Sequence, residues 1–223
     1  MVGLVIFDCD GVLVDSESLA IPVLASKARL AGSKLTNAEA FTLFRGQRFA
    51  HSVAEIEKRS GIKLPEHFET SFREELALTY EAQLQSIAGI HETLTAITCG
   101  FCVASNAPLG KIRQNLKIAG LLAQFEDHIF SAYEVGSWKP DPKLFLHAAS
   151  TMGVEPSRCL VVEDSIYGIE AAKAAGMKVF GFTNGEESVE QSLRGSEVPL
   201  FHNMTDLPHL IAFESIPFMP LLN

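Results

Sequence analysis

Short apolar runs alternate with segments of helical periodicity along most of the chain. Each apolar run is continuous, so both faces of the strand it predicts are expected to be buried. Strands of this kind, each followed by a helix, are typical of an α/β fold with a parallel sheet covered on both faces. The predicted strands are Gly3–Phe7, Phe101–Ser105, Cys159–Val162 and Lys178–Phe182. The predicted helices are Gly89–Ile97, Leu109–Leu122, Pro142–Met152 and Ile166–Ala175.

The stretch from Ser16 to Ser86 breaks this alternation, because it has helical character throughout and contains no convincing strand. Ligand sites in open parallel sheets form beyond the carboxyl ends of the strands. An insert that leaves from the end of the first strand would therefore cover such a site. We expect a core domain formed by residues 1–15 and 87–223, and an inserted all-helical cap at residues 16–86, which serves as a lid.

The strongest chemical signal follows the first predicted strand, in the sequence Asp8-Cys9-Asp10-Gly11. Because side chains alternate along a strand, Asp8 and Asp10 point the same way while Cys9 points to the other face. Two neighbouring carboxylates repel each other unless a cation or a shared proton lies between them, so the pair indicates a divalent metal. Gly11 permits a turn that a larger side chain would block. An acidic turn exposed to water is the simpler interpretation of this motif alone.

Two further motifs carry polar or charged side chains. Ser105 and Asn106 close the second predicted strand, and their side chains either hydrogen-bond phosphate oxygens or cap the following helix. Lys139 lies in Trp138–Pro142, where two prolines stiffen the chain and can hold a positive charge in one place. Either motif alone would be unremarkable at a protein surface.

The third predicted strand ends in a second pair of acids, Glu163 and Asp164. A parallel sheet would bring this pair to the same edge as Asp8. Burying several acids there without a metal would be costly in free energy. The acidic pairs on two strands therefore strengthen the prediction of a metal site.

Composition and charge narrow the classes of partner. Of 223 residues, 47% are hydrophobic and 20% charged, which is ordinary for a folded protein with a core. The net charge of −9 disfavours nucleic acid and anionic membranes as partners. The N-terminus lacks the basic region of a signal peptide, and no run reaches the roughly 18 apolar residues of a membrane span. We expect a cytoplasmic protein that is a monomer or, alternatively, a dimer.

The four cysteines are too few for a disulfide framework in a chain of this length. Cys99 and Cys102 form a C-x-x-C motif, but a second pair or a nearby histidine is missing. We therefore interpret the cysteines as small buried apolar residues.

Together, in this order and with the helical insert, the four motifs resemble those of the haloacid dehalogenase superfamily of phosphatases and phosphomutases. The resemblance extends over essentially the whole chain. It is greatest for the branch with a small helical cap, in the group of β-phosphoglucomutases and sugar-phosphate phosphatases that includes 6-phosphogluconate phosphatase-like enzymes. It implies a Rossmann-like core, a Mg²⁺ cofactor and a small phosphorylated metabolite as the substrate.

The resemblance also implies roles for particular residues. Asp8 would be the nucleophile and Asp10 the general acid and base, while Ser105, Asn106 and Lys139 would hold the transferring phosphoryl group. The implied ligands of the metal are Asp8, Asp10, Glu163 and Asp164.

The chemistry of phosphate esters agrees with these roles. A carboxylate that attacks a phosphate dianion meets like charge, so Mg²⁺ and Lys139 must neutralise the phosphoryl oxygens before Asp8 can approach. The leaving alkoxide needs a proton, which Asp10 can supply before it takes one from the water that hydrolyses the aspartyl-phosphate. We expect Mg²⁺-dependent hydrolysis of a sugar phosphate or sugar-acid phosphate.

Other functions are compatible with such a fold. A haloacid dehalogenase lacks the second acid because a halide leaving group needs no proton, and Asp10 is present here. A phosphonate-cleaving enzyme would need a Schiff-base lysine in the cap, and neither Lys58 nor Lys63 fits that pattern. A phosphomutase uses the same two acids and stays open as the alternative. A non-catalytic protein that binds a phosphorylated metabolite would not need both Asp8 and Asp10.

One loop of the insert bears on the choice between a phosphatase and a phosphomutase. It resembles the specificity loop of the mutases at Gly46 and Ser52, but Phe49 stands where the mutases carry an arginine, which favours a phosphatase. Arg45 and Arg48 lie beside it. Because arginine binds carboxylates and phosphates with two hydrogen bonds, we expect Arg45, Gly46 and Arg48 to select an anionic substrate. A solvated helix face is the alternative.

Overall fold

The computed structural model describes residues 1–44 and 49–214. Contacts between residues divide the chain into two units. One unit is formed by Met1–Val14 together with the chain from Ser86 onwards, and the other by Asp15–Gln85. Both ends of the second unit lie one residue before the limits expected for the cap.

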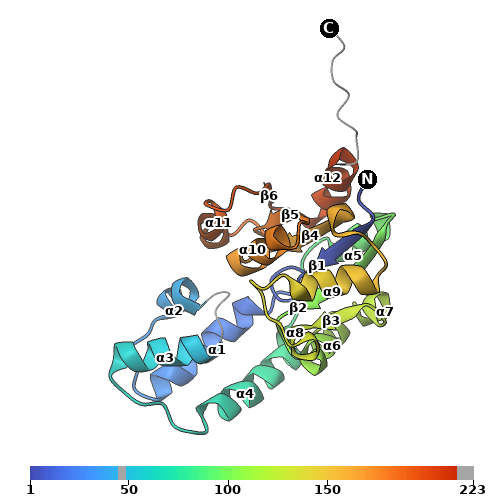
Figure 1. Cartoon of the computed structure of the whole chain (residues 1–223). Helices are drawn as coiled ribbons and strands as arrows, with labels where there is room; N and C mark the ends of the chain where they lie inside the picture. The colour runs from blue at the N-terminus through green and yellow to red at the C-terminus, as the bar shows by residue number, and fades with distance from the viewer. Residues whose placement is uncertain (45–48, 215–223) are drawn as a thin grey trace. The chain divides into compact units, whose positions relative to one another are not determined.

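A sheet of six strands, all paired in parallel, forms the centre of the first unit (Figure 1). The strand order is β3-β2-β1-β4-β5-β6, so β1 lies between β2 and β4. The predicted α/β fold with a parallel sheet is confirmed. The strands are β1 (Leu4–Phe7), β2 (Gly100–Ser105), β3 (Ile129–Ser131), β4 (Cys159–Glu163), β5 (Lys178–Phe182) and β6 (Leu200–Phe201).

The strands β3 and β6 were not predicted. They span only three and two residues, and each lies at an edge of the sheet. An apolar run of that length has no periodicity that separates it from a loop. These strands form because the neighbouring strand offers backbone partners, as Phe182 of β5 does opposite Phe201 of β6.

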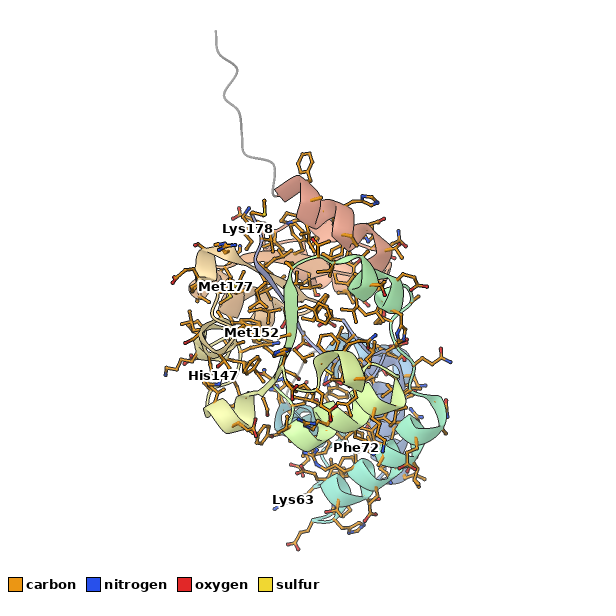
Figure 2. All side chains as sticks on the ribbon, turned by 90° about the vertical axis from the view of Figure 1, so that its right-hand side faces the viewer. Lys63, Phe72, His147, Met152, Met177 and Lys178 are labelled. Carbon is orange, nitrogen blue, oxygen red and sulfur yellow. The ribbon has the colours of Figure 1, made fainter. Side chains whose placement is uncertain are left out.

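Helices cover both faces of the sheet. Leu4 and Ile6 belong to one apolar cluster with residues of α9 and α10. Met177 is part of this cluster and Met152 packs against it, and both are labelled in Figure 2. Because side chains alternate along a strand, Phe7 points to the opposite face. There its ring packs edge-on against Phe125 of α7, with 6.3 Å between the ring centroids.

One predicted helix is wrong in extent. The segment Leu109–Leu122 was expected to be continuous, but α6 ends at Ile118 and a short helix begins at Leu122. Gly120 has a φ of +72°, a left-handed conformation that ends helices and suits glycine. The helices of this unit are α5 (Ile90–Ala96), α6 (Leu109–Ile118), α7 (Leu122–Phe125), α8 (Ala132–Val135), α9 (Lys143–Thr151), α10 (Ile166–Ala174), α11 (Glu187–Leu193) and α12 (Leu207–Glu214), with 3₁₀ turns at Pro156–Arg158 and Met204–Asp206.

Where it is described, the second unit consists of helices, as the sequence predicted. Lys27 of α1 joins α4 through Ser71, with Nζ 2.6 Å from Oγ, and through Glu75, at 2.8 Å. Phe49 of α3 stacks on Phe72 of α4, which is labelled in Figure 2, with 5.0 Å between the centroids. The helices are α1 (Glu17–Leu30), α2 (Asn37–Phe44), α3 (Phe49–Ser60) and α4 (Phe68–Gln83).

Two further expectations concern the cysteines and the absence of a membrane span. Cys102 is buried and Cys99 half-buried, and burial raises the pKa of both thiols, which leaves them protonated at neutral pH. All four cysteines are unbridged. Within residues 1–44 and 49–214, no helix has the length and apolar character that a membrane span requires.

Candidate active site

Adjacent strands bring the predicted acids to one edge of the sheet. Asp8 follows the last residue of β1, and its backbone N–H donates to the carbonyl of Val162 on β4, at 3.0 Å. Glu163 is the last residue of β4 and Asp164 comes next. Because β1 and β4 are parallel neighbours, their carboxyl ends lie side by side. The three carboxylates therefore gather around the end of the central strand.

Lys139 joins two of these acids. Its Nζ lies 2.5 Å from Oδ1 of Asp8 and 2.5 Å from Oε1 of Glu163. The ammonium group also lies 4.9 Å from the centroid of the Phe145 ring, a cation–π contact. The Lys139 side chain is only 3% exposed, so its charge acts with little screening by water.

Burial perturbs both Asp8 and Lys139. Loss of hydration raises the pKa of Asp8 to about 7, even though the charge of Lys139 lowers it, and the charge of Glu163 raises it further. Burial by itself lowers the pKa of Lys139, but the charges of Asp8 and Glu163 outweigh this and raise it. Lys139 therefore stays a cation, while Asp8 needs additional positive charge nearby to be fully ionised at neutral pH.

The carboxylates are arranged so that they could share a metal ion. Asp8, Glu163 and Asp164 each offer an oxygen, and these atoms all lie within 4.8 Å of one another. One ammonium group cannot balance three carboxylates, and carboxylate oxygens are the ligands that hard divalent cations prefer. The donor set therefore fits a divalent cation. Among the described residues, Asp10 is not part of this group.

The absence of a side chain at Gly11 makes room for the carboxylate of Asp164. A Cβ atom at position 11 would lie 2.1 Å from Oδ2 of Asp164, and the φ of Gly11 is +84°. Both the close approach and the left-handed backbone require glycine. The glycine that the sequence indicated for a turn therefore also makes room for an acid from the neighbouring strand.

Ser105 and Asn106 have different surroundings. Ser105 ends β2 and is buried, and its Oγ accepts a hydrogen bond from the N–H of Ala107 at 3.1 Å. This bond leaves the hydroxyl proton able to donate to an anion. Asn106 instead contacts the backbone of Lys139, since its Oδ1 accepts from the Lys139 N–H at 2.9 Å and its Nδ2 lies 3.5 Å from the carbonyl. Asn106 thus holds the Lys139 segment.

The carboxylate of Asp10 is held from α6. Lys111 Nζ donates to Oδ2 of Asp10, and Asn115 Nδ2 donates to Oδ1, each at 3.4 Å. The sequence alone did not identify either partner. For Asn115 a signal existed, because it is a polar residue between Ile112 and Leu116 on the buried face of the helix. For Lys111 none did, since a lysine in a helix is ordinarily a solvated side chain.

The predicted specificity residues Arg45, Gly46 and Arg48 lie outside the described residues. The neighbouring Phe49 is described, and its ring stacks on Phe68 and Phe72 of α4. Its side chain therefore contributes to packing within the helical unit.

Comparisons with known proteins identify the family of the chain. Residues 2–176 match the family described as haloacid dehalogenase-like hydrolase. The 6-phosphogluconate phosphatase of Escherichia coli (strain K12) is 33% identical over 207 residues, which cover 92% of this chain and 93% of that protein. The phosphorylated carbohydrates phosphatase of Thermotoga maritima is 25% identical over 210 residues, covering 88% of this chain and 92% of its own.

Solved structures share the fold over nearly the whole chain. A conserved haloacid dehalogenase-like protein of unknown function from Agrobacterium tumefaciens has a TM-score of 0.89 and 34% identity, covering 97% of this chain and all of its own. A hydrolase from Deinococcus radiodurans, with bound phosphate and sodium, has a TM-score of 0.82 and 30% identity, covering 95% and 96%. The chain therefore belongs to the haloacid dehalogenase-like hydrolases and, as its motifs predicted, is an enzyme of the phosphatase class.

Proposed function

We propose that this phosphatase hydrolyses phosphate monoesters of small metabolites, sugar phosphates or sugar-acid phosphates above all, with Mg²⁺ as its cofactor. The observation that carries the proposal is the position of Asp8, whose carboxylate lies at the end of the central strand against the buried ammonium group of Lys139. The names of the two relatives described above, which refer to 6-phosphogluconate and to phosphorylated carbohydrates, support the substrate class.

In the proposed reaction, a carboxylate oxygen of Asp8 attacks phosphorus and the bond to the leaving oxygen breaks. Asp10 gives the leaving oxygen its proton, and the phosphoryl group is then held on Asp8 as an acyl phosphate. Water attacks this phosphorus, loses a proton to Asp10 and releases inorganic phosphate. Both acids return to their starting states, so the cycle is complete without another reactant.

Charge is the main obstacle to the first step, because an anion approaches an anion. Lys139 places a buried positive charge beside Asp8, where it can hold a phosphoryl oxygen, and Ser105 can donate its hydroxyl proton to another. Asn106 and Glu163 act through Lys139, the former on its backbone and the latter on its ammonium group. We therefore assign Asn106 to holding Lys139 in place, and Glu163 to the same task in addition to its place among the proposed metal ligands.

Asp8, Glu163 and Asp164 would hold the Mg²⁺ ion. When bound, the ion supplies positive charge that neutralises phosphoryl oxygens as a Lewis acid. The side chain of Asp10 was also predicted as a ligand, but it is held by Lys111 and Asn115 from α6, so we assign it to proton transfer.

The helical unit is proposed to select the organic part of the substrate. The residues at the end of the sheet serve the phosphoryl group and the cation, so discrimination between esters must come largely from elsewhere. Arg45, Gly46 and Arg48 are the proposed determinants, because two guanidinium groups can bind an anionic sugar. Packing of Phe49 against α4 is consistent with a phosphatase, since this position carries no arginine for a mutase reaction.

The test is a phosphate-release screen of the purified protein with Mg²⁺. It compares sugar phosphates, 6-phosphogluconate and other sugar-acid phosphates, polyol phosphates, phosphoglycolate and nucleotides. We expect the highest kcat/KM on a sugar or sugar-acid phosphate and nearly complete loss with Asp8→Asn, because an amide is a poor nucleophile of the same size. Isomerised sugar phosphate without phosphate release would identify a mutase. Substantial turnover by the folded Asp8→Asn variant would overturn the mechanism.

A further inference from the structure

The geometry points to Lys111 and Asn115 as positioning residues for Asp10, which orient its carboxylate for proton transfer. This inference rests on the proposed function, in which Asp10 is the general acid and base. The two residues are four positions apart on α6 and so lie on the same side of the helix. Each donates to a different oxygen of Asp10, Lys111 to Oδ2 and Asn115 to Oδ1.

The backbone of Asp10 is fixed separately from its side chain. The Gly11 N–H donates to the carbonyl of Val14 at 2.8 Å, and Asp10 and Val14 form a β-bridge. This turn sets where the Asp10 side chain starts but leaves its rotamer to be determined by other contacts. Two donors on different oxygens favour one orientation of the carboxylate. Each oxygen has two lone pairs, so neither bond prevents contact with a leaving group.

Asn115 is difficult to explain as packing. The residue is 1% exposed, and Ile112 and Leu116 beside it on the helix are fully buried. Burying an amide costs free energy unless its polar atoms find partners, and asparagine has a poor helix propensity. An apolar residue would suit this face of α6 better if packing alone mattered. The amide is explained by the acceptor that it meets, the carboxylate of Asp10.

Lys111 contributes a different kind of contact. Its side chain is 36% exposed, against 23% for that of Asp10, so the ion pair lies at the rim of the site. The salt bridge is partly screened by water and contributes little to folding stability. Its effect is on the orientation of the Asp10 carboxylate. Lys111 attracts Oδ2 from the exposed side of the site, while the buried Asn115 contacts Oδ1.

The start of α6 explains how this arrangement is coupled to phosphate. Ser105 ends β2, Asn106 holds Lys139, and α6 begins three residues later at Leu109. One continuous segment therefore carries Ser105, which can donate a hydrogen bond to phosphate, and Asn106, which holds Lys139. The same segment carries both partners of Asp10. The groups that contact the phosphoryl group and those that contact Asp10 are therefore carried by one strand and the helix that follows it.

The experiment is a double-mutant cycle between α6 and Asp10. Lys111→Met keeps the aliphatic stem and removes the charge, and Asn115→Ala removes the amide. Lys117→Met, on the exposed side of the same helix, is the matched control. Each change is made in the wild type and in Asp10→Asn, and kcat and KM are measured on the preferred alkyl phosphate with Mg²⁺.

We expect Lys111→Met and Asn115→Ala to lower kcat by about ten-fold or more with KM within about two-fold, because proton transfer contributes about 10²–10⁴-fold. In Asp10→Asn the same changes should cause no further loss, since positioning residues act only through Asp10. Lys117→Met should leave kcat and KM unchanged, both in the wild type and in Asp10→Asn. Losses that multiply with that of Asp10→Asn, or wild-type kcat in Lys111→Met, would overturn the inference.

A second readout uses p-nitrophenyl phosphate, whose leaving group departs without a proton. Mispositioning Asp10 should spare transfer to Asp8 but slow hydrolysis of the acyl phosphate, so the variants should release about one equivalent of p-nitrophenolate in a burst. If Asn115→Ala does not fold, Lys111→Met still decides the outcome. Full activity of Asp8→Asn would refute the proposed function, whereas the coupling to Asp10 tests only the role of α6.

Discussion

Gly168 on α10 passes directly over the carboxyl group of Glu163. A Cβ atom at position 168 would lie 1.9 Å from Cδ of Glu163, so only glycine permits this packing. The Glu163 carboxylate is held on its other sides by Lys139 and by the N–H and hydroxyl of Ser165. A buried acid, its lysine and the start of a helix therefore form one compact arrangement around the site.

Gly168→Ala should consequently displace Glu163 and, through it, Lys139. Overpacking of this kind costs about 1–3 kcal/mol of unfolding free energy. We expect a loss of that size in urea denaturation, accompanied by a fall in kcat. Gly195→Ala is the control, because a Cβ atom there meets nothing within 4 Å. Equal stability and activity of both variants would show that α10 can shift without disturbing the site.

In the metal-free protein, the stability that Asp8 contributes should be lost as pH rises from about 4 to about 7. Burial raises the pKa of Asp8 from 3.8 to about 7, so the folded state holds a proton that the unfolded state releases in this range. The contribution of Asp8 to stability is therefore highest below the unfolded pKa and declines up to the folded one. Denaturation midpoints in a chelator across this range provide the measurement, with Asp8→Asn expected to flatten the profile. An identical slope in that variant would assign the effect to other groups.

Mg²⁺ should stabilise the folded protein through the acidic group. A ligand at about 100 times its Kd adds about 2.7 kcal/mol to stability when it binds only the folded state. We expect the Tm to rise with Mg²⁺ in the wild type and to change much less in Asp164→Asn, which loses one carboxylate of the group. Asp206→Asn, far along the chain from the group, serves as control. A similar Mg²⁺ response in all three proteins would place the cation elsewhere.

The sequence predicted the parts of the fold that depend on local pattern. The strands at Cys159 and Lys178 are continuous apolar runs, and periodicity suffices to recognise them. The edge strands β3 and β6 are too short for such a pattern and depend on pairing with β2 and β5. The end of α6 depends on the left-handed Gly120, which a helical periodicity does not reveal.

The partners within the site are harder to predict, because they join distant residues. Asn106 meets Lys139 across 33 positions, and Asp10 meets Asn115 across 105. Motifs identified the acids and Lys139 by residue type and order. They could not show that Asn106 serves Lys139, since an amide after a strand suits phosphate, a helix cap or another loop equally well.

Arg48→Ala tests the source of substrate specificity. Arg48 can give a charge-assisted hydrogen bond to an anionic leaving group, and loss of such a bond costs about 1.5–3 kcal/mol. We therefore expect kcat/KM for the preferred sugar or sugar-acid phosphate to fall by roughly ten- to a hundred-fold. p-Nitrophenyl phosphate should be affected much less, because it has no carboxylate or second phosphate for the guanidinium to bind. Equal losses on both substrates would assign Arg48 to general electrostatics or folding, and no loss on either would make it a solvated side chain.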